Sequence, residues 1–258
     1  MIKVPVKIKL PFLWGKAVFK KENWSQVNVI VGPNGSGKTL IANQLAHQFA
    51  NAGYSVRLFN TDLIDEEDIY YSLNKNEKIR TKIEDILSTM FAKEIRFEKG
   101  SDNSIIPVAV NKTHGIEYSI TKDECHGLKK IIALLSTLYV EEQNANCLMI
   151  DEPELHLHPQ FQNFFMSEIR RLAKENPTRL FFIATHSPFF IDLKSPDELL
   201  GVIVCHINSV ATSIDKLSEN DYLLFKKFLP RFNSYHKQFF FSDNQIFVEG
   251  YTDQQILS

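Results

Sequence analysis

The 258-residue sequence is poor in cysteine and in long apolar runs, and its charges nearly cancel. Its three cysteines form no C-x-x-C pair, which argues against a disulfide framework or a zinc ribbon and favours a reducing compartment. The formal net charge of −2 excludes a protein that coats nucleic acid through bulk positive charge. No apolar run reaches the length of a membrane span, and the N-terminus lacks a continuous apolar segment of the signal-peptide type. We therefore expect a cytoplasmic protein without a membrane partner.

What the sequence does contain is material for a substantial core. Hydrophobic residues make up 44% of the chain, and its 20 phenylalanines place much of the core in large rings. Apolar strand-like runs alternate with segments of helical periodicity, a pattern typical of a mostly parallel α/β sheet. The expected strands are 27–31, 55–59, 147–150, 179–184 and 201–206. One helix is expected to start near residue 38, and further helices are expected at 127–140, 159–175 and 219–229.

Two segments stand apart from this alternation. Residues 1–21 carry six lysines and no acid, and their apolar positions alternate from Val4 onward, which predicts an antiparallel N-terminal β part. Residues 61–95 predict a long amphipathic helical stretch that opens on an acidic run beginning at Asp62. Residues 105–110 and 116–120 are expected to pair as a hairpin. We therefore expect a helical insert at about 61–120.

A glycine-rich loop follows the strand 27–31 and opens the next helix. Residues 32–39 fit G-x-x-x-x-G-K-[ST] in the strand–turn–helix setting that gives the motif its meaning. Backbone N–H groups of such a turn form an anion nest, and the helix N-terminus adds positive potential. Lys38 is expected to reach the β- and γ-phosphates of ATP, and the Thr39 hydroxyl to bind Mg²⁺. The predicted nucleotide-binding residues are Gly32, Pro33, Asn34, Gly35, Ser36, Gly37, Lys38 and Thr39.

The strand 147–150 ends in two adjacent carboxylates. Successive side chains on a strand point to opposite faces, so Asp151 and Glu152 cannot have the same role. Asp151 suits magnesium binding, and Glu152 can polarise an attacking water as a general base. A solvated strand end is the alternative, and it is less favoured because a phosphate loop is present in the same chain.

Residues 151–159, Asp-Glu-Pro-Glu-Leu-His-Leu-His-Pro, resemble the second acidic motif and following loop of ABC-type ATPases. The Leu-His-Leu-His-Pro form is similar to a branch that includes the OLD (overcoming lysogenization defect) nucleases and the SMC and RecF-like ATPases. Residues 185–188, Thr-His-Ser-Pro, resemble the switch histidine of that branch, which implies that His186 senses the γ-phosphate. His156 and His158 lie beside no third Cys or His ligand, so a structural or dimer-contact role is expected rather than zinc binding.

The resemblance also implies a head-to-tail homodimer in which a signature loop of the partner closes each nucleotide. The counterpart here is residues 124–130, where Gly127 keeps the glycine that approaches phosphate. Cys125 stands where the family usually has a serine, and a thiol is a weak hydrogen-bond donor. An ordinary start of an amphipathic helix is the alternative. No glutamine loop stands out, and the aromatic residue that stacks on adenine is left open among Phe12, Trp14 and Phe19.

The end of the chain resembles the opening of a Toprim domain. Residues 245–253 form a short apolar run that leads to Glu-Gly, followed by an acid. Glu249 would be the first catalytic, metal-binding acid of such a domain, but one carboxylate cannot hold a two-metal site. A final strand with a Glu-Gly turn is the alternative. We expect an ATPase domain at 1–244 and the incomplete beginning of a Toprim-like domain at 245–258, with no nuclease activity from this chain alone.

These observations predict an OLD-like ABC-type ATPase that binds ATP and Mg²⁺, dimerises around nucleotide and hydrolyses it slowly. The resemblance implies that it regulates a DNA nuclease, attached or separate, in defence against phage. Two alternatives remain. One is an SMC- or RecF-like DNA-repair ATPase, against which the net charge argues mildly. The other is a nucleotide sensor with little turnover.

Overall fold

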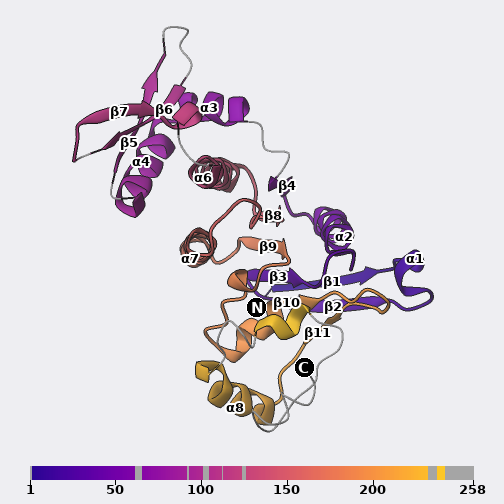
Figure 1. Ribbon diagram of the computed structural model, residues 1–258. Coiled ribbons are helices and arrows are strands. Elements are labelled where there is room, and N and C mark those ends of the chain that lie inside the picture. The colour runs from indigo at the N-terminus through magenta and orange to yellow at the C-terminus, as the bar shows by residue number, and fades with distance from the viewer. Residues whose placement is uncertain are drawn as a thin grey trace.

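The computed structural model describes residues 2–61, 66–91, 93–100, 105–111, 113–123, 126–231 and 237–241. They form an α/β head with a six-stranded sheet, an N-terminal β hairpin, and an insert with its own three-stranded sheet (Figure 1). Of the sequence features discussed above, Asp62, Glu124, Cys125 and Glu249 lie outside the described residues.

The central sheet is mostly parallel, as the alternation of strands and helices predicts. Its order is β11-β10-β3-β9-β8-β4, and every neighbouring pair is parallel except β10 with β11. Its strands are β3 (Val27–Val31), β4 (Val56–Asn60), β8 (Cys147–Asp151), β9 (Leu180–Thr185), β10 (Val202–Val204) and β11 (Thr212–Ser213). The predicted strand positions are therefore confirmed to within a few residues.

The order of the strands gathers three carboxyl ends at one edge of the sheet. β9 lies between β3 and β8, and all three run parallel. Val31 is level with Thr185, and Ala184 is level with Asp151. The loops that leave these strands therefore start side by side, which is where open α/β sheets bind ligands.

Helices cover both faces of this sheet. On one face lies α2 (Lys38–Asn51), and on the other lie α6 (His126–Asn144) and α7 (Pro159–Glu175) (Figure 1). The β3 side chains alternate between the layers: Ile30 packs in the core that includes Ile41 and Leu45 of α2, and Val29 packs in the core that includes Ile169 of α7. Both faces of β3 are buried, so its residues are apolar except for Asn28, whose buried side chain donates to the Ser25 and Phe181 carbonyls.

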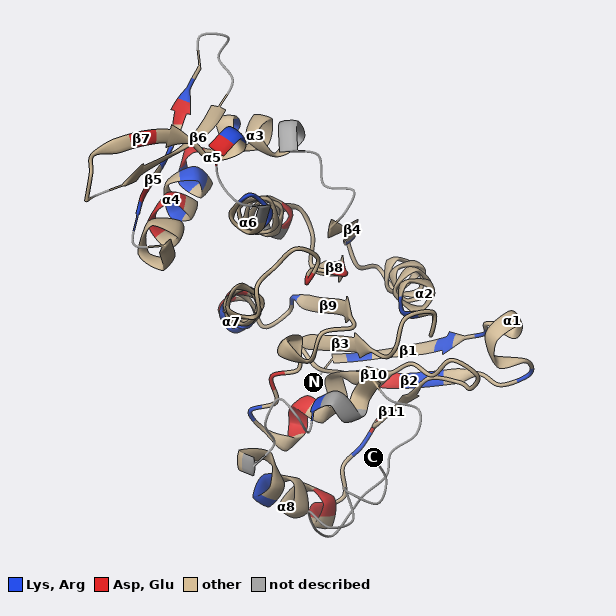
Figure 2. Cartoon of the chain, viewed as in Figure 1, with Lys and Arg blue, Asp and Glu red and all other residues tan. Residues whose placement is uncertain are grey.

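The N-terminal β part is an antiparallel hairpin, as predicted. β1 (Ile2–Ile8) pairs with β2 (Phe19–Trp24), and the short helix α1 (Pro11–Trp14) lies between them. The apolar side chains of β1 pack in the same core as α2, and Trp24 lies fully buried there. The lysines Lys3, Lys7 and Lys9 are exposed to solvent. Figure 2 shows that basic positions occur along both β1 and β2.

The insert contains the predicted helical segment and the predicted hairpin, but it is mixed α/β as a whole, because the hairpin belongs to a three-stranded sheet. The single expected helix is two helices, α3 (Glu66–Lys75) and α4 (Glu77–Phe91), separated at Asn76, whose side chain accepts a hydrogen bond from the Ile79 N–H. The predicted hairpin is confirmed as β6 (Ile105–Asn111) and β7 (Ile116–Ser119). A third strand, β5 (Glu94–Lys99), pairs with β6. The short helix α5 (Ile120–Asp123) leads on toward α6.

After β9, the chain adds β10 and β11 to the central sheet and then forms the helix α8. Short 3-10 helices in this part of the chain are η2 (Pro188–Phe190), η3 (Pro196–Gly201), η4 (Leu229–Arg231) and η5 (Gln238–Phe241). The helix α8 (Glu219–Phe228) begins at Ser218, whose hydroxyl accepts the Asp221 N–H, and it buries none of its side chains. Within the described ranges, no helix is both long and apolar enough to cross a bilayer.

Candidate functional site

The loop between β3 and α2 has a conformation that requires glycine at defined positions. Gly35 and Gly37 have φ angles of 80° and 86°, in the left-handed region that other residues rarely adopt. At Gly32, a Cβ atom would lie 2.4 Å from the carbonyl oxygen of Cys205. The loop therefore turns tightly against the end of β10 before α2 begins. Because its three glycines have no side chains, none blocks access to the backbone N–H groups of the loop.

Two polar groups of the loop are buried and suited to an anion. The Lys38 ammonium is buried and donates to the carbonyl oxygens of Gly32 and Pro33, each at 3.0 Å. The Ser36 hydroxyl is also buried, and it has no hydrogen-bond partner among the described residues. A buried hydroxyl without a partner is costly unless a ligand satisfies it. The loop therefore fits the phosphate chain of a nucleotide.

The loop and the acidic strand end meet directly. The Thr39 hydroxyl donates to Oδ2 of Asp151 at 2.8 Å. Oδ1 of Asp151 is buried and accepts no hydrogen bond within the described part of the chain. Burial raises the pKa of the Asp151 carboxyl, and the Thr39 hydroxyl and the Lys38 ammonium only partly oppose this. A hydroxyl beside a buried carboxylate oxygen without a partner is a suitable donor set for Mg²⁺.

Glu152 follows with an unusual backbone. Its φ angle is 51°, which is uncommon for a residue other than glycine, and its N–H donates to the Ala184 carbonyl at 2.8 Å. The hydrogen bond extends the pairing of β8 with β9 by one residue, while the positive φ turns the chain away from the strand. Positive φ angles at residues other than glycine are strained and persist only where the surrounding structure holds them, and they are frequent at functional sites. The half-buried Glu152 side chain thus leaves the sheet edge beside Asp151.

His186 lies at the same edge because it directly follows β9. Its side chain is 39% exposed, and its Nδ1 atom lies 2.9 Å from Oε1 of Glu154, a carboxylate in the loop after β8. The structure therefore brings the predicted residues Lys38, Thr39, Asp151, Glu152 and His186 to one edge of the sheet.

Two further hydrogen bonds at this edge of the sheet were not predicted from the sequence. The Thr61 hydroxyl donates to the Asp151 carbonyl at 3.0 Å, and the Thr61 carbonyl accepts from the ammonium of Lys130 on α6. Thr61 follows β4, and β4 pairs with β8. These contacts join three separate segments of the chain at Asp151, and only the strand order reveals them.

Gly127 belongs to a different part of the surface. A Cβ atom on it would lie 3.6 Å from the His156 carbonyl and 3.7 Å from the Phe161 ring, so it packs against the start of α7 rather than the phosphate loop. The Lys129 ammonium donates to the Thr121 carbonyl at 2.6 Å. This placement leaves the role predicted for Gly127, contact with the nucleotide of a partner head, as a prediction.

His158, for which a structural or dimer-contact role was predicted, lies at the start of α7. It caps the helix, because its ring accepts the Gln160 N–H.

Of the three aromatic candidates for adenine stacking, Trp14 and Phe19 are buried, whereas Phe12 is 70% exposed on α1. The Leu13 side chain next to it lies 2.7 Å from where a Cβ of Gly37 would be, so α1 borders the phosphate loop. Phe12 is thus the aromatic residue available to a base.

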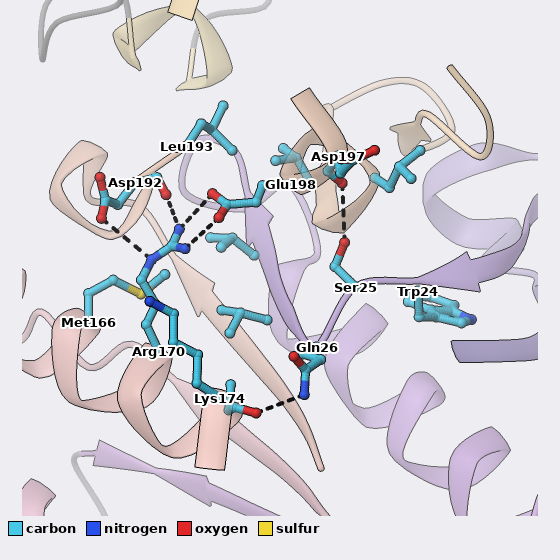
Figure 3. Close-up of a pocket in the computed structure, with 15 residues that line it drawn as sticks. Trp24, Ser25, Gln26, Met166, Arg170, Lys174, Asp192, Leu193, Asp197 and Glu198 are labelled. Carbon is cyan, nitrogen blue, oxygen red and sulfur yellow. Dashed lines mark hydrogen bonds and ion pairs between the residues drawn. The ribbon is translucent and has the colours of Figure 1, made fainter. Parts of the chain in front are cut away.

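A cavity of about 360 Å³ lies at the opposite end of β3. Figure 3 shows that Arg170 of α7 projects into it, toward Asp192 and Glu198. The Arg170 guanidinium contacts both carboxylates, with its Nη1 atom 2.8 Å from Glu198. Because its walls include the amino end of β3, and the phosphate loop follows the carboxyl end, this cavity does not belong to the phosphate site.

Comparison with known proteins supports the nucleotide-binding interpretation. A family model described as AAA ATPase domain matches residues 121–191, and one described as Novel STAND NTPase 3 matches residues 16–113. An OLD nuclease of Thermus scotoductus is 29% identical over 111 residues, which are 42% of this chain and 21% of that protein. The chain thus spans about a fifth of the length of this relative.

Solved structures show the fold. The SMC head domain from Thermotoga maritima has a TM-score of 0.53 at 13% identity, covering 84% of this chain and 100% of that one. An SMC head bound to the C-winged helix domain of ScpA has a TM-score of 0.52 at 14% identity, covering 81% of this chain and 95% of that one. The chain therefore has the α/β fold of a P-loop ATPase head, with a mostly parallel central sheet.

Proposed function

We propose that this chain is an ATPase head that binds ATP with Mg²⁺, hydrolyses it, and dimerises around the nucleotide. The observation that carries the proposal is the contact of the Thr39 hydroxyl with Asp151, 2.8 Å long, beside the buried ammonium of Lys38. It joins the phosphate loop to the acidic strand end, which is the arrangement that a bound phosphate chain and its cation require. The matches to ATPase families support it.

Each residue has a distinct task in this proposal. The loop N–H groups and Lys38 bind the phosphates, and Thr39 and Asp151 hold Mg²⁺, which neutralises charge on the phosphate oxygens. Glu152 orients the attacking water and accepts its proton. His186 contacts the γ-phosphate from the neighbouring strand end. Phe12 stacks on the base, and Gly127 faces the nucleotide of the second head.

Replacing Lys38 with alanine tests the binding step. We expect the affinity for ATP to fall by about 10- to 100-fold, the effect of losing a hydrogen bond to a charged group. Isothermal titration calorimetry with ATP and Mg²⁺ measures it, with circular dichroism to verify folding. Lys174→Ala on the exposed surface of α7 is the matched control and keeps wild-type affinity. Equal affinity in wild type and Lys38→Ala would rule out this phosphate site.

We further propose that the head regulates a DNA nuclease and that the pair defends against phage. The similarity to an OLD nuclease supports this part. Supercoiled plasmid, with Mg²⁺ or Mn²⁺, is incubated with residues 1–258 alone and together with the nuclease that they regulate, attached or separate. We expect residues 1–258 alone to leave the plasmid intact and the nuclease to cut it at a rate that depends on ATP. A cleavage rate that does not depend on ATP would refute regulation by the head. The plating efficiency of phage on cells with and without the protein tests the proposed defence.

A second function, a DNA-clamping head, is favoured by one observation. Lys7 and Lys20 are exposed and lie opposite each other in the β1–β2 pair, although like charges opposite each other destabilise a hairpin. A phosphate backbone would relieve this repulsion. Duplex DNA binding whose affinity falls steeply with salt would support the clamp. ATP binding without turnover would instead support a nucleotide sensor.

A further inference from the structure

Glu154 is a buried carboxylate that the nucleotide site, as described so far, does not use. It lies in the loop after β8 and is 6% exposed. Its Oε1 atom accepts the backbone N–H of His186 at 2.6 Å and lies 2.9 Å from the Nδ1 atom of the same histidine. A buried carboxylate is costly unless it gains partners of this kind. Burial raises the pKa of Glu154, and the hydrogen bonds from the His186 N–H and from Thr185 oppose the shift.

A second set of hydrogen bonds fixes the loops on either side of this contact. The Gln162 side chain donates to the Leu157 carbonyl at 2.8 Å and accepts from the Ser187 hydroxyl. The Leu157 N–H in turn donates to the Glu154 carbonyl at 2.9 Å. The Gln162 side chain therefore holds the segment that carries Glu154 to the segment that carries His186, in addition to the contacts of Glu154 itself.

The surroundings of the imidazole are asymmetric. Its Nδ1 atom is buried and lies 2.9 Å from Oε1 of Glu154, as an ion-pair contact without hydrogen-bond geometry, whereas 39% of the side chain is exposed. A buried ring nitrogen beside a carboxylate oxygen carries the proton, because the alternative places a lone pair against negative charge. The Nε2 edge then lies on the side away from Glu154. The ring cannot flip without breaking this contact.

We propose that Glu154 is a positioning residue that fixes the tautomer and orientation of the His186 ring, so that its Nε2 edge is presented to the nucleotide. This inference rests on the proposed function in one respect, namely that His186 contacts the γ-phosphate. Glu154 itself touches no phosphate and no attacking water in this arrangement, in contrast to Glu152. Its effect on turnover passes through the histidine.

The state of the ring is tested without nucleotide. In ¹⁵N-labelled protein, long-range ¹H–¹⁵N spectra distinguish a protonated from an unprotonated Nδ1, and His186→Gln identifies the signals of this ring among the eight histidines. We expect a protonated Nδ1 in wild type and in Glu154→Gln, whose amide oxygen still accepts, and a mixture of tautomers in Glu154→Ala. An Nδ1 that is unprotonated in wild type, or unaffected in Glu154→Ala, would overturn the proposal.

Turnover provides the second measurement. We expect Glu154→Ala to lower kcat by about 10- to 100-fold, because the ring loses the carboxylate contact that orients it, with the KM for ATP nearly unchanged. In the His186→Gln background the same change should have no further effect, because the two residues act as a unit. Glu154→Gln serves if the alanine variant does not fold, and it should lose less. Glu175→Gln, at the exposed end of α7, is the matched control.

The outcomes separate the two proposals. If Glu154→Ala lowers kcat by the same factor with and without His186, Glu154 does not act through the histidine and the inference fails. If wild type hydrolyses no ATP, the proposed function fails, but the ring spectra still decide whether Glu154 sets the tautomer of His186.

Discussion

Replacing Glu152 with glutamine is expected to lower the kcat for ATP hydrolysis by about 10²- to 10⁴-fold, the range that a positioned general base contributes. The amide keeps the size of the side chain but cannot accept a proton from water. The turn at Glu152 should persist, because its 2.8 Å hydrogen bond to Ala184 involves only the backbone. Phosphate release with saturating ATP and Mg²⁺ measures the effect, and calorimetry should show ATP affinity close to that of wild type.

The same variant reports on dimerisation. If two heads close on ATP and open after hydrolysis, the variant should accumulate as a dimer with ATP, which multi-angle light scattering detects. Glu175→Gln should hydrolyse ATP like wild type and remain mostly monomeric. Turnover that is equal in wild type and Glu152→Gln would show that another group activates the water. A monomer with bound ATP would refute closure of two heads.

Replacing Trp24 with alanine is expected to have the largest effect on stability, a loss of about 3–5 kcal/mol in the free energy of unfolding. The indole is fully buried, and its N–H donates to the Val4 carbonyl at 2.8 Å. Its ring lies edge-on to Phe49 and Phe182, with centroid distances of 5.3 and 5.4 Å. The side chain thus joins the hairpin, α2 and the central sheet in one contact cluster.

Urea unfolding followed by circular dichroism measures this loss, which is a large share of the roughly 5–15 kcal/mol that stabilises a typical domain. Phe12→Ala is the matched control. That ring is 70% exposed, so its removal should change the free energy of unfolding by less than about 0.5 kcal/mol. A loss below about 1 kcal/mol for Trp24→Ala would show that the neighbouring rings close the cavity.

The phosphate loop and the acidic strand end could be predicted because their chemistry is local. A strand, a glycine-rich turn and a helix adjoin in the sequence, so the motif at 32–39 carries its own structural context. The parallel sheet followed from the alternation of strand-like and helical runs. The contact of Thr39 with Asp151 required the fold itself, because 112 residues separate them.

The features that were missed depend on tertiary context or on a weak local signal. Glu154 resembles any acid in a surface loop, and only the packing of β9 against β8 brings His186 to it from 32 residues away. Strand β5 had a detectable signal, since its inward Ile95 and Phe97 alternate with charged residues. That signal directly follows the helical periodicity of α4, so the preceding pattern obscured it.

The strand order also has a consequence for how the protein forms during synthesis. β3 carries the start of the phosphate loop, yet its two sheet neighbours, β9 and β10, consist of residues that are translated only after residue 179. Until then the Val27–Val31 segment has no strand to pair with on either side, and unpaired apolar edges favour aggregation. The ribosome-bound intermediate should therefore depend on chaperones. ATP should not assist its folding before His186 has been translated, because the proposed nucleotide site includes this residue.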